Sequence, residues 1–302
     1  MKNDLITYTT PETYYSIGIC ELMLKSPHIL IGGTTGAGKS VLIENIIYTL
    51  ISKYTPFDVR FFLIDTKRVT FERYKHLPHV EQIQTEIPAI IKLLRAMVET
   101  MEKRYEYMRQ NGLVKYNGRH LFIIIDEMAD LMSIRTKKNK KVSDIVTPLI
   151  QRLAQLGRAC NIHLICATQC PNRQIIPAVI TVNFSGRCAL RCNNQIESRQ
   201  ILNQKGAELL PQYGKCIYLH CDGNYYMGDI PYIDDEIQAK IDFWLKQGNN
   251  DAYFKQTLPG DIPTIPRPSY TFLDFLRGNT LVKRKNIDET ELQNILSMID
   301  DD

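Results

Sequence analysis

The stretch "GGTTGAGKS" (residues 32–40) directly follows the apolar run "HILI" (28–31) and precedes an amphipathic segment. It fits the pattern G-x-x-x-x-G-K-[S/T] at every fixed position, from Gly33 to Ser40. Glycines let the backbone turn so that its N–H groups converge on phosphate oxygens, and the following helix adds its positive dipole end. An ordinary glycine-rich turn is the alternative, but the strand–loop–helix context favours a phosphate-binding loop (P-loop).

The pattern also assigns roles to side chains. Lys39 is expected to reach the β- and γ-phosphates, and the Ser40 hydroxyl is expected to ligate Mg²⁺. ATP and Mg²⁺ are the predicted cofactors. The predicted ATP-binding residues are Gly33, Thr34, Thr35, Gly36, Ala37, Gly38, Lys39, Ser40 and Val41.

A P-loop needs a second, acidic site, and "LFIIIDE" (121–127) supplies one 87 residues after Lys39. Asp126 can hold Mg²⁺ through water, and Glu127 can polarise the attacking water, which ATP hydrolysis requires. An ordinary strand that ends in acids is the alternative, and Asp65 is a weaker competitor for the acidic role. Gln169 closes "IHLICATQ" (162–169), where it can sense the γ-phosphate or position water; a helix cap or a loop contact is the alternative.

The rest of the chain alternates apolar runs with helical patterns. The runs at 28–33, 59–65, 121–127, 162–169 and 186–192 are rich in β-branched and aromatic residues, as strands covered on both faces are. Helices are predicted over 40–54, 87–112 and 142–160, a hairpin over 214–230 and a last helix over 233–248. This alternation predicts a doubly wound α/β fold with a mainly parallel sheet.

Composition and charge narrow the class of protein. The chain has 302 residues and is 44% hydrophobic, enough for one large core. Residues 231–302 hold 13 acidic and 8 basic residues (net −5), so the net charge of +4 leaves +9 on residues 1–230, where a polyanion can dock. The start shows no signal peptide, and no run reaches about 18 apolar residues, so a cytoplasmic protein is expected.

Eight cysteines leave a metal site open. Cys166/Cys170 and Cys188/Cys192 share a four-residue spacing that zinc ligands can have. Cys166 and Cys188 lie inside strand-like apolar runs, which favours small buried hydrophobes over ligands.

Several segments together resemble the FtsK/SpoIIIE DNA translocases. They are "SPHILIGGTTGAGKSVLIENIIYTL", "DVRFFLIDTKRVTFERYKHLPHV", "LFIIIDEMADLM", "RLAQLGRACNIHLICATQCPN" and "IESRQILNQKGAELL". Their order and spacing agree from about Ser16 to Lys255, which is most of the chain.

The resemblance implies a RecA-like P-loop motor core that assembles as a hexameric ring and moves double-stranded DNA by ATP hydrolysis. ATP would bind between subunits, with an arginine reaching in from the neighbour. On this basis we divide the chain into a lead-in (1–27), a motor domain (28–257) and a proline-containing linker with an acidic, mostly helical tail (258–302).

The resemblance carries over residue by residue. Lys39, Ser40, Asp126, Glu127 and Gln169 match the family's site. Arg187 falls where the family places an arginine on a strand, and Arg158 is the runner-up for the arginine acting in trans; an ordinary salt bridge is the alternative for each.

The resemblance and the basic residues also suggest DNA contacts. Arg199 and Lys205 match a segment near the pore, and Lys215 with the "CDGNYY" hairpin can supply a second loop. Such contacts would be to phosphates. For the basic stretch "RTKKNKK" (135–141) a solvated loop is favoured.

The chain departs from the family in length. About 27 residues precede the P-loop strand and about 45 follow the core, too few for the family's membrane region or winged-helix domain. We therefore expect a stripped motor, for which DNA handling by a plasmid, a conjugative element or a phage is at least as strong a hypothesis as chromosome partitioning at the division septum. An ATPase for protein secretion or conjugation coupling is the alternative, and a nucleotide-dependent regulator is a third.

Overall fold

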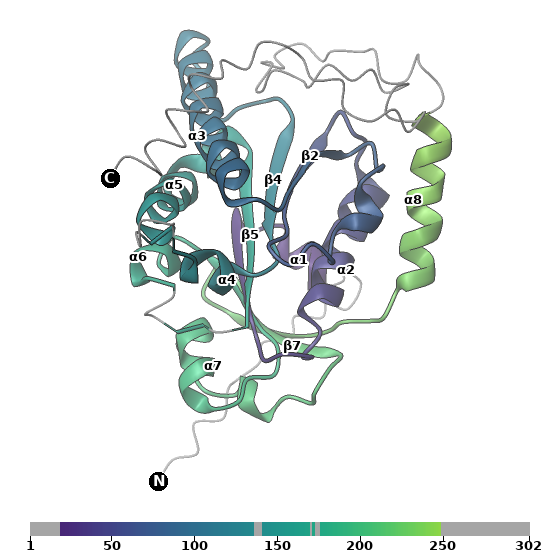
Figure 1. Ribbon diagram of the computed structural model, residues 1–302, viewed down its shortest axis with the longest axis vertical. Coiled ribbons are helices and arrows are strands. Elements are labelled where there is room, and N and C mark those ends of the chain that lie inside the picture. The colour runs from purple at the N-terminus through teal and green to yellow at the C-terminus, as the bar shows by residue number, and fades with distance from the viewer. Residues whose placement is uncertain (1–18, 136–140, 170, 173–175, 249–302) are drawn as a thin grey trace.

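The computed structural model describes residues 19–248, except 136–140, 170 and 173–175. Its centre is an eight-stranded sheet in the order β3-β2-β4-β5-β1-β6-β7-β8 (Figure 1). The first six strands of this order are parallel, and β7 and β8 continue the sheet as an antiparallel hairpin. The doubly wound, mainly parallel α/β architecture predicted from the sequence is therefore confirmed.

The strands coincide with the apolar runs. Their bounds are β1 His28–Gly32, β2 Val59–Ile64, β3 Val80–Gln84, β4 His120–Ile125, β5 Ile162–Thr168, β6 Gly186–Ala189, β7 Lys215–Leu219 and β8 Tyr225–Asp229. All five residues of β1 are buried, as expected of a central parallel strand with helices on both faces.

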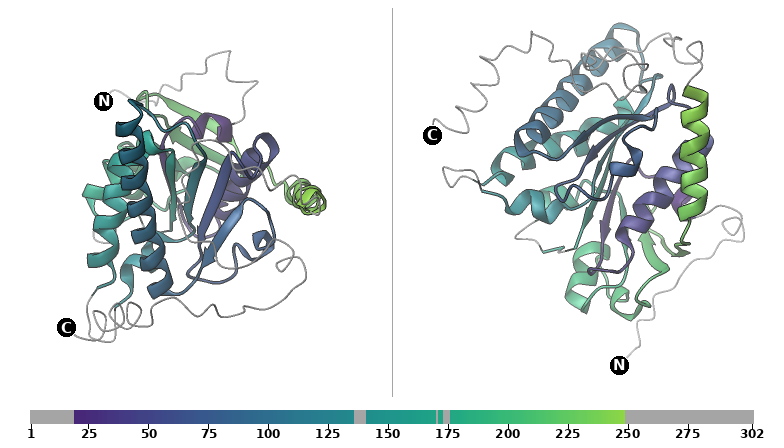
Figure 2. Two further views of the ribbon diagram at one scale, coloured as in Figure 1. Left: turned by 90° about the horizontal axis from the view of Figure 1, so that it is seen from above. Right: turned by 45° about the vertical axis from the view of Figure 1, so that its right-hand side comes forward.

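Helices cover both faces of the sheet (Figure 2). On one face lie α1 (Ile19–Met23), α2 (Lys39–Lys53) and α8 (Asp234–Gly248), which share a core with alternate residues of β1 and β2. On the other lie α3 (Ile87–Gln110), α4 (Met128–Ser133), α5 (Ser143–Leu156) and α6 (Ala178–Thr181). A smaller cluster joins α7 (Gln195–Leu202) to β6 and β7. Three-residue or four-residue 3₁₀ turns are η2 (Glu72–Tyr74), η3 (Gly157–Cys160) and η4 (Ala207–Leu209).

Several elements differ from the sequence-based expectation, which lacks the short helices α1, α4 and α6. β3 was not predicted, because "VEQIQ" is half-buried at the sheet edge and mixes polar with aliphatic residues. The helix expected over 142–160 ends at Leu156 and continues as η3. α7 lies in a segment that was noted only for its family resemblance. Its N-cap is Asn194, whose side chain accepts a hydrogen bond from the N–H of Glu197, and the sequence offers no other clear helix signal there.

The proposed boundaries at 27/28 and 257/258 remain predictions. α1 falls inside the expected lead-in, and its Leu22 and Met23 are buried in the core beside α2. The linker and tail expected over 258–302 lie outside the described residues. Over the residues that the structure describes, no helix combines the length and apolar character needed to cross a bilayer.

Candidate nucleotide-binding and hydrolysis site

The P-loop leaves the carboxyl end of β1 and leads directly into α2. Gly36 and Gly38 adopt φ of 75° and 95°, the left-handed region that only glycine enters at little cost. A Cβ placed on Gly36 would meet nothing within 4 Å, so this side of the loop faces open space. The loop is also tied to the strand beside it, because the N–H of Thr34 donates to the carbonyl of Arg191 at 2.8 Å.

Lys39 lies folded across the loop. Its Nζ donates to the carbonyls of Gly33 and Thr34 at 2.7 and 2.6 Å, and the residue is only 7% exposed. Burial lowers the pKa of Lys39 to about 8, while the nearby carboxylates of Glu127 and Asp126 act against this shift. The P-loop lysine and the acid pair, far apart in the sequence, therefore share one electrostatic environment.

The acid pair, Asp126 and Glu127, directly follows β4. Asp126 is buried, and its Oδ2 accepts a hydrogen bond from the Thr70 hydroxyl at 2.8 Å. Glu127 is 2% exposed and caps α4, where its Oε1 accepts from the N–H of Ala129 at 3.1 Å. Burial raises the pKa of both carboxyls.

Gln169 connects the two halves of the site. Its main-chain N–H lies 3.1 Å from both carboxylate oxygens of Glu127, and its side-chain Oε1 accepts from the Thr35 hydroxyl at 2.7 Å. One residue at the end of β5 thus contacts both the P-loop and Glu127. The contact with Thr35 is also the loop contact of the alternative, so the role of Gln169 in sensing phosphate or positioning water stays a prediction.

Asp65, the competing acid, has a different task. Its Oδ2 accepts from the N–H groups of Thr70 and Phe71 at 2.8 and 3.2 Å, and its Oδ1 accepts from the N–H of Lys67 at 3.1 Å. A carboxylate committed to three main-chain donors shapes a turn, so Asp126 is the better candidate for the metal.

The residues present fit Mg²⁺ and a nucleoside triphosphate. The loop offers open glycine backbone at the N-terminus of a 15-residue helix, Ser40 is exposed in the first turn, and an acid pair lies by Lys39. Ser40 and Asp126 would hold the metal. When bound, Mg²⁺ would neutralise charge on the β- and γ-phosphate oxygens.

The two candidate trans arginines lie in different surroundings. Arg187, on β6, donates to the carbonyls of Phe184 and Thr181 at 3.1 and 2.9 Å and to the Asn203 side chain at 3.0 Å. Burial lowers its pKa. Arg158, on η3, is exposed, and its guanidinium has no hydrogen bond or ion pair with any residue in the described part of the chain.

The predicted DNA-contact residues lie near the hairpin end of the sheet. Arg199 on α7 and Lys205 after it are exposed, and neither side chain pairs with a described residue. Lys215 forms an ion pair with Asp229 across the β7–β8 hairpin. Their DNA-binding role stays a prediction.

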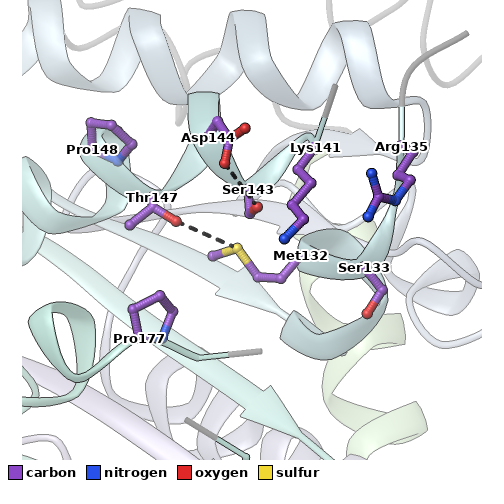
Figure 3. A pocket seen from close by; sticks show the side chains of 9 residues that line it. All are labelled: Met132, Ser133, Arg135, Lys141, Ser143, Asp144, Thr147, Pro148 and Pro177. Atoms are coloured by element: carbon purple, nitrogen blue, oxygen red, sulfur yellow. Dashed lines mark hydrogen bonds between the residues drawn. The ribbon is translucent and has the colours of Figure 1, made fainter. Parts of the chain in front are cut away.

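Arg135 and Lys141, the two ends of the basic stretch, border a separate cavity of about 720 Å³ beside α4 and α5 (Figure 3). Arg135 and Lys141 pair as an antiparallel bridge at its rim, and Met132, Pro148 and Pro177 give it an apolar side. Residues 136–140 lie outside the described residues. This cavity contains none of the predicted site residues.

The cysteines of the zinc hypothesis are separated by the fold. Cys166 is buried in β5, Cys188 in β6 and Cys192 after β6. Burial raises the pKa of all three thiols. Within 19–248, less the omitted positions, no group of three or more potential ligands lies together; Cys170 lies outside the described residues.

Sequence reasoning missed two side chains of the site. Thr70 contacts Asp126, and the Nζ of Lys67 lies 3.8 Å from Glu127 Oε2. Both come from the segment "DTKRVTF" (65–71) after β2. The position of that segment after a parallel strand was the available signal, because carboxyl ends of parallel strands gather at one edge.

A sequence profile described as the FtsK/SpoIIIE family matches residues 17–120 and 114–173. Curated relatives include "DNA translocase FtsK" of Rickettsia prowazekii, 30% identical over 300 residues that cover 85% of this chain and 39% of the relative. "DNA translocase SftA" of Bacillus subtilis is 37% identical over 210 residues, 65% of this chain and 21% of the relative. The chain thus spans about two-fifths or less of the length of these curated relatives.

Solved structures share the fold. The pCW3 conjugation coupling protein TcpA, solved with ATPγS, superposes with a TM-score of 0.65 at 25% identity, over 74% of this chain and 65% of TcpA. The cytoplasmic domain of the type VII secretion ATPase EccC of Thermomonospora curvata gives 0.60 at 25% identity, over 73% of this chain and 28% of that one.

Proposed function

Because this chain belongs to the FtsK/SpoIIIE family and is a P-loop ATPase by family and fold, we propose that it drives double-stranded DNA through a hexameric ring. The observation that carries the proposal is the convergence of Lys39, the acid pair and Gln169 around one loop. A nucleotide sensor would need the loop, but not a buried carboxylate next to the metal ligand.

The residues divide the proposed reaction among themselves. Lys39 and the loop N–H groups bind the phosphates, and Ser40 and Asp126 hold Mg²⁺. Glu127 orients the attacking water and takes its proton as the water oxygen bonds to the γ-phosphorus; the bond from the γ-phosphorus to the β–γ bridging oxygen breaks, which yields ADP and phosphate. Gln169 links Thr35 of the P-loop to Glu127, so the release of phosphate can change the hydrogen bonds at the end of β5.

We propose Arg158 as the arginine that acts in trans. β1 and β5 are parallel, and η3 lies just before β5. Arg158 is therefore at the amino ends of the strands, whereas its own P-loop is at their carboxyl ends. A residue that serves a neighbouring subunit must be exposed and away from its own site, and Arg158 is both. The guanidinium of Arg187 is already satisfied within its own chain.

The proposed DNA contacts are Arg199 and Lys205, with Lys215 contributing less because it is paired with Asp229. Cations that contact phosphates give binding that is tolerant of sequence and weakened by salt. The net charge of +9 on residues 1–230 also favours the binding of a polyanion such as DNA.

The test is ATP turnover with and without linear double-stranded DNA at low salt. We expect DNA to stimulate turnover, and Lys39→Ala to abolish it because the phosphates lose their buried cation. Lys53→Ala, at the exposed end of the same helix, is the control and should retain turnover. An ATP turnover rate that DNA does not change, together with no DNA binding at low salt, would contradict the proposal.

A second candidate is an ATPase of protein secretion or conjugation coupling, the activities named for the two structural neighbours. The same assay separates them, since a secretion ATPase should respond to its protein substrate and not to DNA. Stimulation by linear double-stranded DNA alone would exclude the secretion reading.

A further inference from the structure

The turn between β2 and η2, residues 65–71 (the β2–η2 turn), lies against the acid pair without belonging to the P-loop or to β4. No part of the proposed mechanism uses it. Two of its side chains nevertheless face the site, and the conformation of the turn explains how they are held there.

Asp65 fixes the path of this turn. Its buried carboxylate accepts hydrogen bonds from the main-chain N–H groups of Lys67, Thr70 and Phe71. Hydrogen bonds to an ionised acceptor are stronger than those between neutral groups. The carboxylate therefore closes the turn around itself and sets the direction in which each following side chain leaves.

The main chain at Arg68 is strained to complete the turn. Its φ of 61° lies in the left-handed region, which costs a residue other than glycine roughly 1–3 kcal/mol. The Arg68 side chain pairs with Glu86 at the start of α3. Arg68 is therefore engaged outside the acid pair.

Lys67 and Thr70 point toward the site instead. The Lys67 ammonium lies 3.8 Å from Glu127 and 3.6 Å from Asp130. The Thr70 hydroxyl donates to Asp126 Oδ2 at 2.8 Å, while Asp126 Oδ1 accepts no hydrogen bond from the described residues. A donor on one oxygen fixes the plane of the carboxylate and leaves the other oxygen free to accept from metal-bound water.

We propose that Thr70 is a positioning residue that orients Asp126 for Mg²⁺-bound nucleotide, and that the β2–η2 turn is built to hold its hydroxyl in place. The inference rests on the proposed metal site of the ATPase and deepens it. Partners that orient metal ligands typically contribute 10–100-fold in metal affinity or activity, so the effect is measurable.

The experiment measures ADP binding by titration calorimetry, once with Mg²⁺ and once with EDTA. Thr70→Val keeps the shape of the side chain but removes the donor. We expect it to weaken ADP binding with Mg²⁺ about 10-fold and to leave binding in EDTA within about twofold of wild type. Thr70→Ser, which restores the hydroxyl, should recover most of the Mg²⁺-dependent affinity.

Thr181→Val on α6 is the matched control, because its hydroxyl contacts only a main-chain carbonyl of its own helix. Thr70→Ala provides a second donor-free variant in case the valine is not accommodated, and thermal melting reports folding of each. Equal weakening with and without Mg²⁺, or unchanged Mg²⁺-dependent affinity in a folded donor-free variant, would overturn the inference. If the wild-type protein bound ADP equally well with Mg²⁺ and with EDTA, the proposed metal site itself would be overturned.

Discussion

Main-chain donors hold both oxygens of Glu127, in addition to the nearby Lys67 ammonium. Both of its oxygens accept from the N–H of Gln169, and one also accepts from the N–H of Ala129. Such donors do not move with rotamer changes, so the carboxylate is fixed in place before any substrate binds. At the residue scale, the origin of the donors distinguishes the two acids: those of Asp65 all come from its own turn, whereas Gln169 reaches Glu127 from the end of β5.

Replacing Glu127 by Gln should separate nucleotide binding from hydrolysis. The amide keeps an oxygen for the N–H groups of Gln169 and Ala129, but it cannot take a proton from water. We expect turnover to fall by at least ~100-fold while ADP affinity stays near that of wild type. Single-turnover hydrolysis and calorimetry check this, with Glu99→Gln on the exposed face of α3 as the control.

At the element scale, η3 and β6 present their arginines in opposite ways. Asn161, which ends η3 at a left-handed φ of 55°, donates to the carbonyls of Tyr116 and Gly118 at 2.9 Å. The Arg104 guanidinium donates to the carbonyl of Cys160 at 2.6 Å. These contacts fix the turn from beneath, and Arg158 projects from it into solvent.

Arg158→Ala should therefore reduce ATP turnover, whereas Arg187→Ala should reduce the stability of the fold. We expect Arg158→Ala to lose DNA-stimulated turnover by ~100-fold or more with an unchanged melting temperature. Arg187→Ala removes three hydrogen bonds of a half-buried guanidinium and should lower the free energy of unfolding by roughly 1–3 kcal/mol.

Mixing experiments add the test of action in trans. An excess of the Arg158→Ala subunit should poison wild-type turnover more than in proportion to its share, because each ATP site would depend on the neighbour. Strictly proportional loss, or a destabilised Arg158→Ala subunit, would contradict the assignment.

At the scale of the whole molecule, four histidines pack against or within the sheet: His28 and His79 are buried, and His120 and His163 are half-buried. His163 and His120 stack across β5 and β4, with 2.9 Å between His163 Nε2 and His120 Nδ1. Because a carbonyl only accepts, His163 Nδ1 donates to Pro27 at 3.0 Å, which leaves its Nε2 to accept from His120.

Burial lowers the pKa of His28, His79 and His120 to about 4 and that of His163 to about 3. The unfolded chain takes up protons near pH 6.5, before the folded chain does, so stability is lost as the pH falls from about 6.5 toward 4. Each histidine contributes roughly 1.4 kcal/mol per pH unit within that window. The raised pKa values of Asp126 and Glu127 act in the opposite direction.

We therefore expect a markedly lower urea midpoint at pH 5 than at pH 7.5. Nitrogen-15 NMR of the histidine rings should show these four neutral at pH 5, with the His163 proton on Nδ1. A midpoint that does not change, or protonated rings in the folded protein at pH 5, would contradict this.

The sequence alone determined the site's chemistry and the layers of the fold. Short-range patterns carried both: the fixed spacing of the P-loop, the apolar runs of buried strands and the acids that end one of them. These features depend on neighbours along the chain, which is why β1, β2, β4 and β5 begin within one residue of their predicted starts. The half-buried edge strand β3 lacked such a pattern.

Only the tertiary structure distinguished several similar residues by their surroundings. Asp65 and Asp126 both end strands, and Arg158 and Arg187 both lie in family-like segments. The fold separated them by their partners: main-chain donors around Asp65, a single hydroxyl on Asp126, three acceptors on Arg187 and open solvent around Arg158. It also brought Thr70 to Asp126, 56 residues away in the sequence. Burial and contacts of that kind depend on segments distant in sequence, and no local pattern encodes them.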